Sequence, residues 1–293
     1  MPILTAALVA GGLAFLPVDI NTAITAIQAM GPRRLDITYE GYLPLPVIGT
    51  RIKAANASIS AWIGPSAYNI VSRAEAAGIV GWFVDYNLTI SSTGVIGPDG
   101  LKPTHYDSFN KDGKKNRHVL VDFGADDVVT TATPHFGDMG FPPASHEQKM
   151  ESMDPLAAIV QLSLGGEATP ANPCGGPIRA YDGKQRYDLK LTFAGRIAYR
   201  SEAYTGPALK CDVEYVELAG FKNKTPEQRA KDKGDVQWTN MILAELDDGA
   251  VKPPLKIEAR SKARGRIGIE ATKLTWRPAE PAQPVSASVR QGG

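Results

Sequence analysis

Residues 186–193 read RYDLKLTF, and polar and apolar side chains alternate at every position. Successive side chains of an extended strand point to opposite faces, so this stretch predicts a strand with one apolar and one polar face. The Asp182-Gly183 pair just before it suits a tight turn between strands. The same period of two recurs outward along the chain, in residues 35–40, 82–91, 119–123 and 210–217. Together these stretches predict an all-β, antiparallel protein.

One short helix interrupts the strand pattern. Asp154 and Pro155 are typical of an N-cap followed by proline at the first helical position. Leu156, Ile159 and Val160 then fall on one helical face. We expect this helix to end near Leu162 or Leu164.

The chain of 293 residues is predicted to form one folded domain between two terminal segments. Residues 1–29 begin with an uncharged apolar run too short for a confident membrane span, which favours an export signal, cleaved or retained. Residues 30–277 form the β-rich domain. Residues 278–293 are rich in Pro, Ala, Ser and Gly, so we expect a flexible tail. The alternative for the first segment is a hydrophobic strand or helix of the fold itself.

Two cysteines, Cys174 and Cys211, are the only ones in the chain. An even number in an exported protein suggests one disulfide. The alternative is a pair of buried free thiols in a cytosolic protein.

Charge excludes some partners. The formal net charge is +1, so no global field favours nucleic acid. A local excess of basic residues lies near the C-terminus, where Lys256, Arg260 and Lys262 would share one face of a strand. This basic edge either prevents sheet-to-sheet aggregation or contacts anionic lipid headgroups, which would make any membrane contact peripheral.

The sequence offers little support for catalysis. It contains no Gly-x-Ser-x-Gly elbow and no Cys-x-x-Cys pair, and no cofactor or phosphate-loop motif. His135 and His146, with Asp138 and Glu147, are the minor alternative of a metal-dependent hydrolase. We therefore expect no enzyme, no metal and no cofactor.

Apolar strand faces are the strongest functional signal. These faces are more extensive than one short helix can cover, so they either pack on each other or enclose a hydrophobic or amphiphilic ligand. The residues expected to face such a ligand are Trp82, Val84, Tyr86, Tyr187, Leu189, Leu191 and Phe193.

Several stretches together resemble the bacterial family catalogued as domain of unknown function 3108. The resemblance covers most of residues 35 to about 276 and implies an exported, β-rich envelope protein. It also implies a strongly curved sheet or incomplete barrel akin to lipoprotein-carrier folds, and no established activity. The residues that carry it are 39–42 (YEGY), 78–86 (GIVGWFVDY), 101–103 (LKP) with Tyr106, 154–157 (DPLA), 172–174 (NPC) and 181–188 (YDGKQRYD).

The function predicted from these observations is a noncatalytic periplasmic binding or carrier protein for a lipid or other amphiphile. The alternative is a structural or interaction protein that supports the cell envelope through protein partners.

Overall fold

The computed structural model describes residues 25, 31–45, 50–82, 84–112, 116–225, 227–228, 235–262 and 265–280. Apart from Thr25, the predicted signal segment 1–29 lies outside them, as does the tail beyond residue 280. Within this part of the chain, no helix is both long and apolar enough to cross a bilayer.

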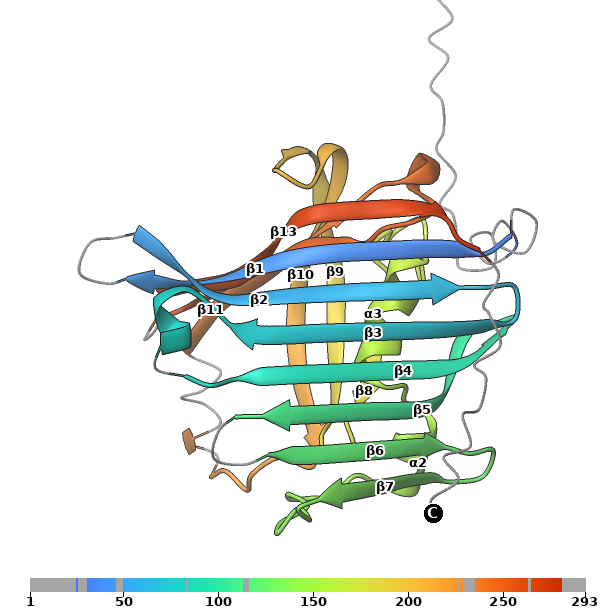
Figure 1. Cartoon of the computed structure of the whole chain (residues 1–293), viewed down its shortest axis with the longest axis vertical. Helices are drawn as coiled ribbons and strands as arrows, with labels where there is room; N and C mark the ends of the chain where they lie inside the picture. Colours follow the sequence, from blue (N-terminus) through green and yellow to red (C-terminus); the bar gives the residue numbers. More distant parts are fainter. Residues whose placement is uncertain are drawn as a thin grey trace, which may run out of the picture.

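Thirteen strands form one antiparallel sheet (Figure 1). The all-β, antiparallel prediction is therefore confirmed. In chain order the strands are β1 (Arg33–Leu45), β2 (Thr50–Ile63), β3 (Ala67–Ala76), β4 (Asn87–Gly97), β5 (Gly100–Lys111), β6 (Arg117–Phe123), β7 (Val128–Thr133), β8 (Ile178–Tyr181), β9 (Arg186–Arg200), β10 (Thr205–Ala219), β11 (Val236–Ala244), β12 (Pro254–Ser261) and β13 (Gly265–Pro278).

The spatial order is β7-β6-β5-β4-β3-β2-β1-β13-β12-β11-β10-β9-β8. Every neighbouring pair is consecutive in the chain except β1 and β13. These two strands, the first and the last, pair with each other in the middle of the sheet. In that pair Leu35 lies opposite Trp276 and Tyr39 opposite Ala271. The free edges are β7 and β8, and β9 and β10 run across behind β2–β6 (Figure 1).

The domain extends slightly past its predicted end. β13 runs to Pro278, and the backbone N–H of Ala279 donates to the carbonyl of Pro32 at 2.9 Å. The indole N–H of Trp62 donates to the carbonyl of Glu280 at 3.0 Å. Residues 278–280, expected in the tail, are thus tied to the sheet.

Helical segments occupy the connections: η1 (Gly78–Trp82), α2 (His146–Met150), α3 (Pro155–Ser163) and η2 (Asp247–Gly249). The prediction of a single short helix misses α2. A capping box starts α2, since the hydroxyl of Ser145 accepts from the N–H of Gln148 and the Gln148 side chain accepts from the N–H of Ser145.

The predicted strand 82–91 is wrong in its first half. Gly78 adopts φ +59°, and a Cβ there would lie 2.6 Å from the carbonyl oxygen of Lys53. The chain therefore turns through η1 against β2 before the N–H of Ala76 pairs with the carbonyl of Tyr86 at 3.0 Å. β4 begins only at Asn87.

α3 lies inside the curved sheet, between two groups of strands, β1–β3 and β9–β11, which we call the two arms of the sheet. Leu156, Val160 and Leu164 pack against β1–β3, whereas Ala158 and Leu162 pack against β9–β11. The helix starts where the carboxylate of Asp154 accepts from the N–H groups of Leu156 and Ala157, both at 2.9 Å. Much of the apolar strand surface is thus covered from within.

Candidate functional site

A groove of about 410 Å³ lies between β4–β6 and the turn that joins β8 to β9. This volume falls within the range of about 300–1,000 Å³ typical of small-ligand pockets. Its apolar lining consists of Tyr86, Leu88, Tyr106, Val119 and Phe136. Its polar lining consists of Ser108, Asn110, Asp112, Arg117, Asp182, Lys184 and Gln185.

The sheet wall of the groove follows from strand alternation. Tyr106, Ser108 and Asn110 point to one face of β5, and Arg117 and Val119 to the same face of β6. Ser108 lies opposite Val119, and Asn110 lies opposite Arg117. The wall therefore changes from apolar to polar along the strands, with Arg117 and Asn110 at its polar end.

The β8–β9 turn forms the opposite side. Oδ1 of Asp182 accepts from the N–H groups of Lys184 at 2.9 Å and Gln185 at 2.7 Å. Burial raises the pKa of Asp182 against the lowering effect of these hydrogen bonds. Gly183 adopts φ +95°, and a Cβ there would lie 2.6 Å from Cγ1 of Val119. The turn thus rests directly on β6, as close as a glycine allows.

Two cations lie near one aromatic ring at this site. The guanidinium carbon of Arg117 lies 4.7 Å from the ring centre of Phe136, and Nζ of Lys184 lies 5.7 Å from it. Neither cation takes part in any ion pair within 4.0 Å among the described residues. We call Arg117, Phe136 and Lys184 the cationic corner of the groove.

Two buried polar atoms at the same end lack partners. Nε of Arg117 and Oδ1 of Asn110 are shielded from solvent and make no hydrogen bond within the described part of the chain. Buried polar groups are nearly always hydrogen-bonded, so an unpaired donor and an unpaired acceptor on one groove wall require an explanation.

A second groove of about 400 Å³ has cations that are already paired. Arg51, Lys53 and Glu270 line it. Lys53 pairs with Glu40, and Arg51 lies 3.7 Å from Glu258, which also accepts a hydrogen bond from the hydroxyl of Tyr42. This groove therefore offers an anionic ligand no unpaired cation among its described lining residues.

The predicted basic edge does not exist as an edge. β12 pairs with β11 on one side and with β13 on the other, so its residues lie within the sheet. Nζ of Lys256 lies 3.4 Å from both Glu258 and Glu270, whereas Arg260 and Lys262 are exposed. Glu258 and Glu270 were part of the charge balance in the sequence, but only the pairing of β12 with β13 shows that both lie beside Lys256.

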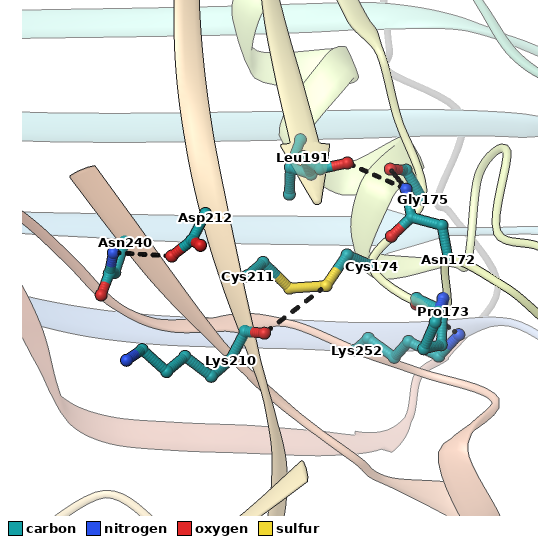
Figure 2. Close-up of a disulfide and its surroundings, with 10 residues drawn as sticks. All are labelled: Asn172, Pro173, Cys174, Gly175, Leu191, Lys210, Cys211, Asp212, Asn240 and Lys252. Atoms are coloured by element: carbon teal, nitrogen blue, oxygen red, sulfur yellow. Dashed lines mark hydrogen bonds between the residues drawn. A yellow bond between two sulfur atoms is a disulfide. The ribbon is translucent and has the colours of Figure 1, made fainter. Parts of the chain in front are cut away.

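The disulfide prediction is confirmed. Cys174, in the segment after α3, is bonded to Cys211 of β10 with an S–S distance of 2.00 Å (Figure 2). Both residues are buried beside Leu162 and Leu191. The side-chain amide of Asn172 also donates to the carbonyl of Leu191 at 2.9 Å, so the segment is tied to both β9 and β10.

The residues predicted to face a ligand have different environments. Tyr86 lines the groove, and Val84, between η1 and β4, is 46% exposed. Trp82 ends η1, and its side chain lies outside the described part. The ring of Tyr187 lies 5.1 Å from that of Tyr215. Three others pack in the core beside α3 and the disulfide: Leu189, Leu191 and Phe193.

Sequence reasoning missed the cationic corner. Lys184 follows the Asp182-Gly183 pair, which by itself accounts for a turn at this position. Phe136 lies in a proline-rich connection that has no periodicity. A signal was present at Arg117, which shares the strand phase of the apolar Val119 and Val121. A charged residue in a core-facing phase is a local inconsistency of the kind that functional sites produce.

No histidine is among the described residues that line this groove. Nδ1 of His146 lies 3.5 Å from the carboxylate of Asp127, and His105 and His118 contact Asp122 and Asp107. Among the residues the structure describes, no group of three or more His, Cys, Asp or Glu side chains could hold a metal ion.

Comparisons with known proteins identify relatives without assigning a ligand or an activity. A family model described as "Protein of unknown function (DUF3108)" matches residues 35–272. No curated protein matches the chain. The chain is similar to the crystal structure of a beta-barrel-like protein of domain of unknown function DUF1849 from Brucella abortus. That match has 10% sequence identity and a TM-score of 0.42, and it covers 84% of this chain and 97% of the other.

Proposed function

The chain belongs to the DUF3108 family of proteins of unknown function, and we propose that it is a noncatalytic binding or carrier protein for a hydrophobic or amphiphilic envelope ligand. The observation that carries this proposal is the groove of about 410 Å³ with an aromatic and aliphatic wall. Concave sites that combine apolar walls with a few polar groups are the usual form of small-ligand sites.

A periplasmic location is part of the proposal. Its support is the Cys174–Cys211 disulfide, because such bonds persist in oxidising compartments and are rare in the cytosol. The apolar run near the N-terminus of the sequence favours export as well.

Blocking the groove tests the binding function. Ser108 lines the groove on β5, and Ser91 lies on the neighbouring β4, opposite Asp107, on the other face of the sheet. A Ser108→Phe variant would fill the groove, and Ser91→Phe would add the same ring outside it. The probe is the neutral fluorophore N-phenyl-1-naphthylamine, whose emission rises in an apolar site.

We expect saturable probe binding by the wild type and by Ser91→Phe. In Ser108→Phe the added ring occupies the space of the probe, so we expect the affinity to fall about tenfold or more, which corresponds to about 1.4 kcal/mol. Thermal melts of both variants verify that they are folded. Absence of saturable binding by the wild type, or equal affinity in the two variants, would contradict the proposal.

A structural or interaction role is the second candidate. An exposed apolar patch favours it: Phe141 is 64% exposed, Tyr215 49% and Leu218 36%, and Phe221 joins them. Patches of this kind mark interaction surfaces. Crosslinking in intact cells distinguishes the two roles, because recovery of one stoichiometric protein partner, with no ligand in the groove, would favour the interaction role.

A further inference from the structure

We propose that the cationic corner binds the anionic headgroup of the ligand, which makes the ligand an amphiphile with a carboxylate or phosphate group. This inference rests on the proposed binding function and names the ligand class of the same groove. Its starting point is the pair of positive charges at Arg117 and Lys184, which both lie within 6 Å of the centre of the Phe136 ring.

The first step concerns unsatisfied charge. Charges that are shielded from solvent are usually paired, yet Arg117 has no carboxylate partner within 4.0 Å in the described chain. Its Nε is buried without an acceptor. A guanidinium presents donors in a planar fork that matches the oxygens of a carboxylate or phosphate.

The second step concerns the negative charges of the groove. The Asp182 carboxylate is engaged by the N–H groups of its own turn. Asp112 is exposed at the rim. An incoming anion would therefore contact Arg117 and Lys184 first, and the amide of Asn110, whose Oδ1 is unpaired, could donate to or accept from a headgroup hydroxyl.

The third step concerns the rest of the ligand. Asn110 and Arg117 are cross-strand partners on β5 and β6, and Leu88 lies beside Asn110 on β4. Tyr86 and Tyr106 line the same groove. At the polar end of the groove, the lining also changes across the strands, from Arg117 on β6 through Asn110 on β5 to Leu88 on β4, which matches a molecule with a charged end and an apolar body.

Four ligands with the same dodecyl chain test the headgroup: dodecanoate, dodecyl phosphate, dodecanol and dodecyltrimethylammonium, titrated calorimetrically below their micelle concentrations. We expect the two anions to bind about tenfold or more tighter than the cation, because hydrogen bonds to charged groups are among the strongest. Tighter binding of the phosphate identifies a phospholipid-type headgroup, and tighter binding of dodecanoate a fatty acid.

Matched variants locate the effect. Arg117→Gln and Lys184→Gln should each weaken binding of the anions about tenfold and change binding of neutral N-phenyl-1-naphthylamine much less. Arg200→Gln, at an exposed arginine of β9 outside the groove lining, should change neither. Thermal melts verify that all three variants are folded.

The outcomes separate the two proposals. If the neutral probe binds but the anions bind no tighter than the cation, or the two glutamine variants lose no anion affinity, the headgroup inference is wrong and the binding function stands. If neither probe nor amphiphile binds the wild type, both proposals are wrong.

Discussion

The hydroxyl of Ser92 on β4 donates a 2.6 Å hydrogen bond to Oδ2 of Asp154, the residue that caps α3. Both residues are fully buried. Because the other carboxylate oxygen accepts from the first turn of α3, one side chain connects the helix to the sheet that it fills. This connection fixes α3 between the two arms of the sheet.

Burial at this connection predicts an unusual pH dependence. Desolvation raises the pKa of Asp154 from 3.8 to about 6, against the lowering effect of its hydrogen bonds. The folded state therefore takes up a proton as the pH falls through about 6, whereas the unfolded state does so only near 3.8. Asp154 should add stability on acidification between these values, by up to about 3 kcal/mol.

The measurement is urea unfolding at several pH values, with the difference taken between the wild type and Asp154→Asn. Asparagine is also a good N-cap but does not titrate, so the variant removes this contribution. A wild type that loses stability relative to Asp154→Asn as the pH falls from 6 towards 4 would contradict the prediction.

Gly183 should be intolerant of a side chain. A Cβ at this residue would lie 2.6 Å from Val119 in a backbone conformation of φ +95°. Gly183→Ala should lower the free energy of unfolding by about 1–3 kcal/mol and widen the groove at the turn. Gly137→Ala is the control, because nothing lies within 4 Å of a Cβ there. Equal stability of the two variants in urea titrations would show that the turn does not rest on β6.

Loss of the disulfide should destabilise the domain. The bond joins residues separated by 37 positions, for which the chain-entropy model gives about 4 kcal/mol. The double variant Cys174→Ala, Cys211→Ala should therefore melt well below the wild type, and reductant should affect only the wild type. A melting temperature unchanged by reduction would refute the prediction.

Glu258 should contribute more to the stability of the fold than an exposed glutamate does. It accepts a hydrogen bond from Tyr42 and lies within 3.7 Å of Arg51, Lys256 and Arg266. Glu258→Gln leaves these cations facing one another and should lower stability by about 1–3 kcal/mol. The control is Glu75→Gln, because the carboxylate of Glu75 accepts a hydrogen bond from the exposed amide of Asn56. Similar unfolding midpoints for the two variants would count against the network.

The fold was predictable from local signals, and the site mostly was not. Alternation at residues 186–193 and the Asp154-Pro155 cap correspond directly to β9 and α3, because strand phase and helix caps are properties of neighbouring residues. The strand predicted from Trp82 fails because the contact between Gly78 and Lys53 decides the path, and that contact joins distant segments.

Non-local pairing also explains the errors at the site. Leu191 and Phe193 are apolar as predicted, but α3 covers them, and no periodicity shows which strands a helix will cover. The cationic corner brings together β6, the connection after β7 and the β8–β9 turn, so its three residues are never close in the sequence.

Native mass spectrometry of detergent-free protein mixed with dodecanoate tests the central claim most directly. The account predicts a one-to-one complex for the wild type and for Ser91→Phe, and no complex for Ser108→Phe. A wild type that stays at its unliganded mass, or a Ser108→Phe variant that binds as well as Ser91→Phe, would contradict it.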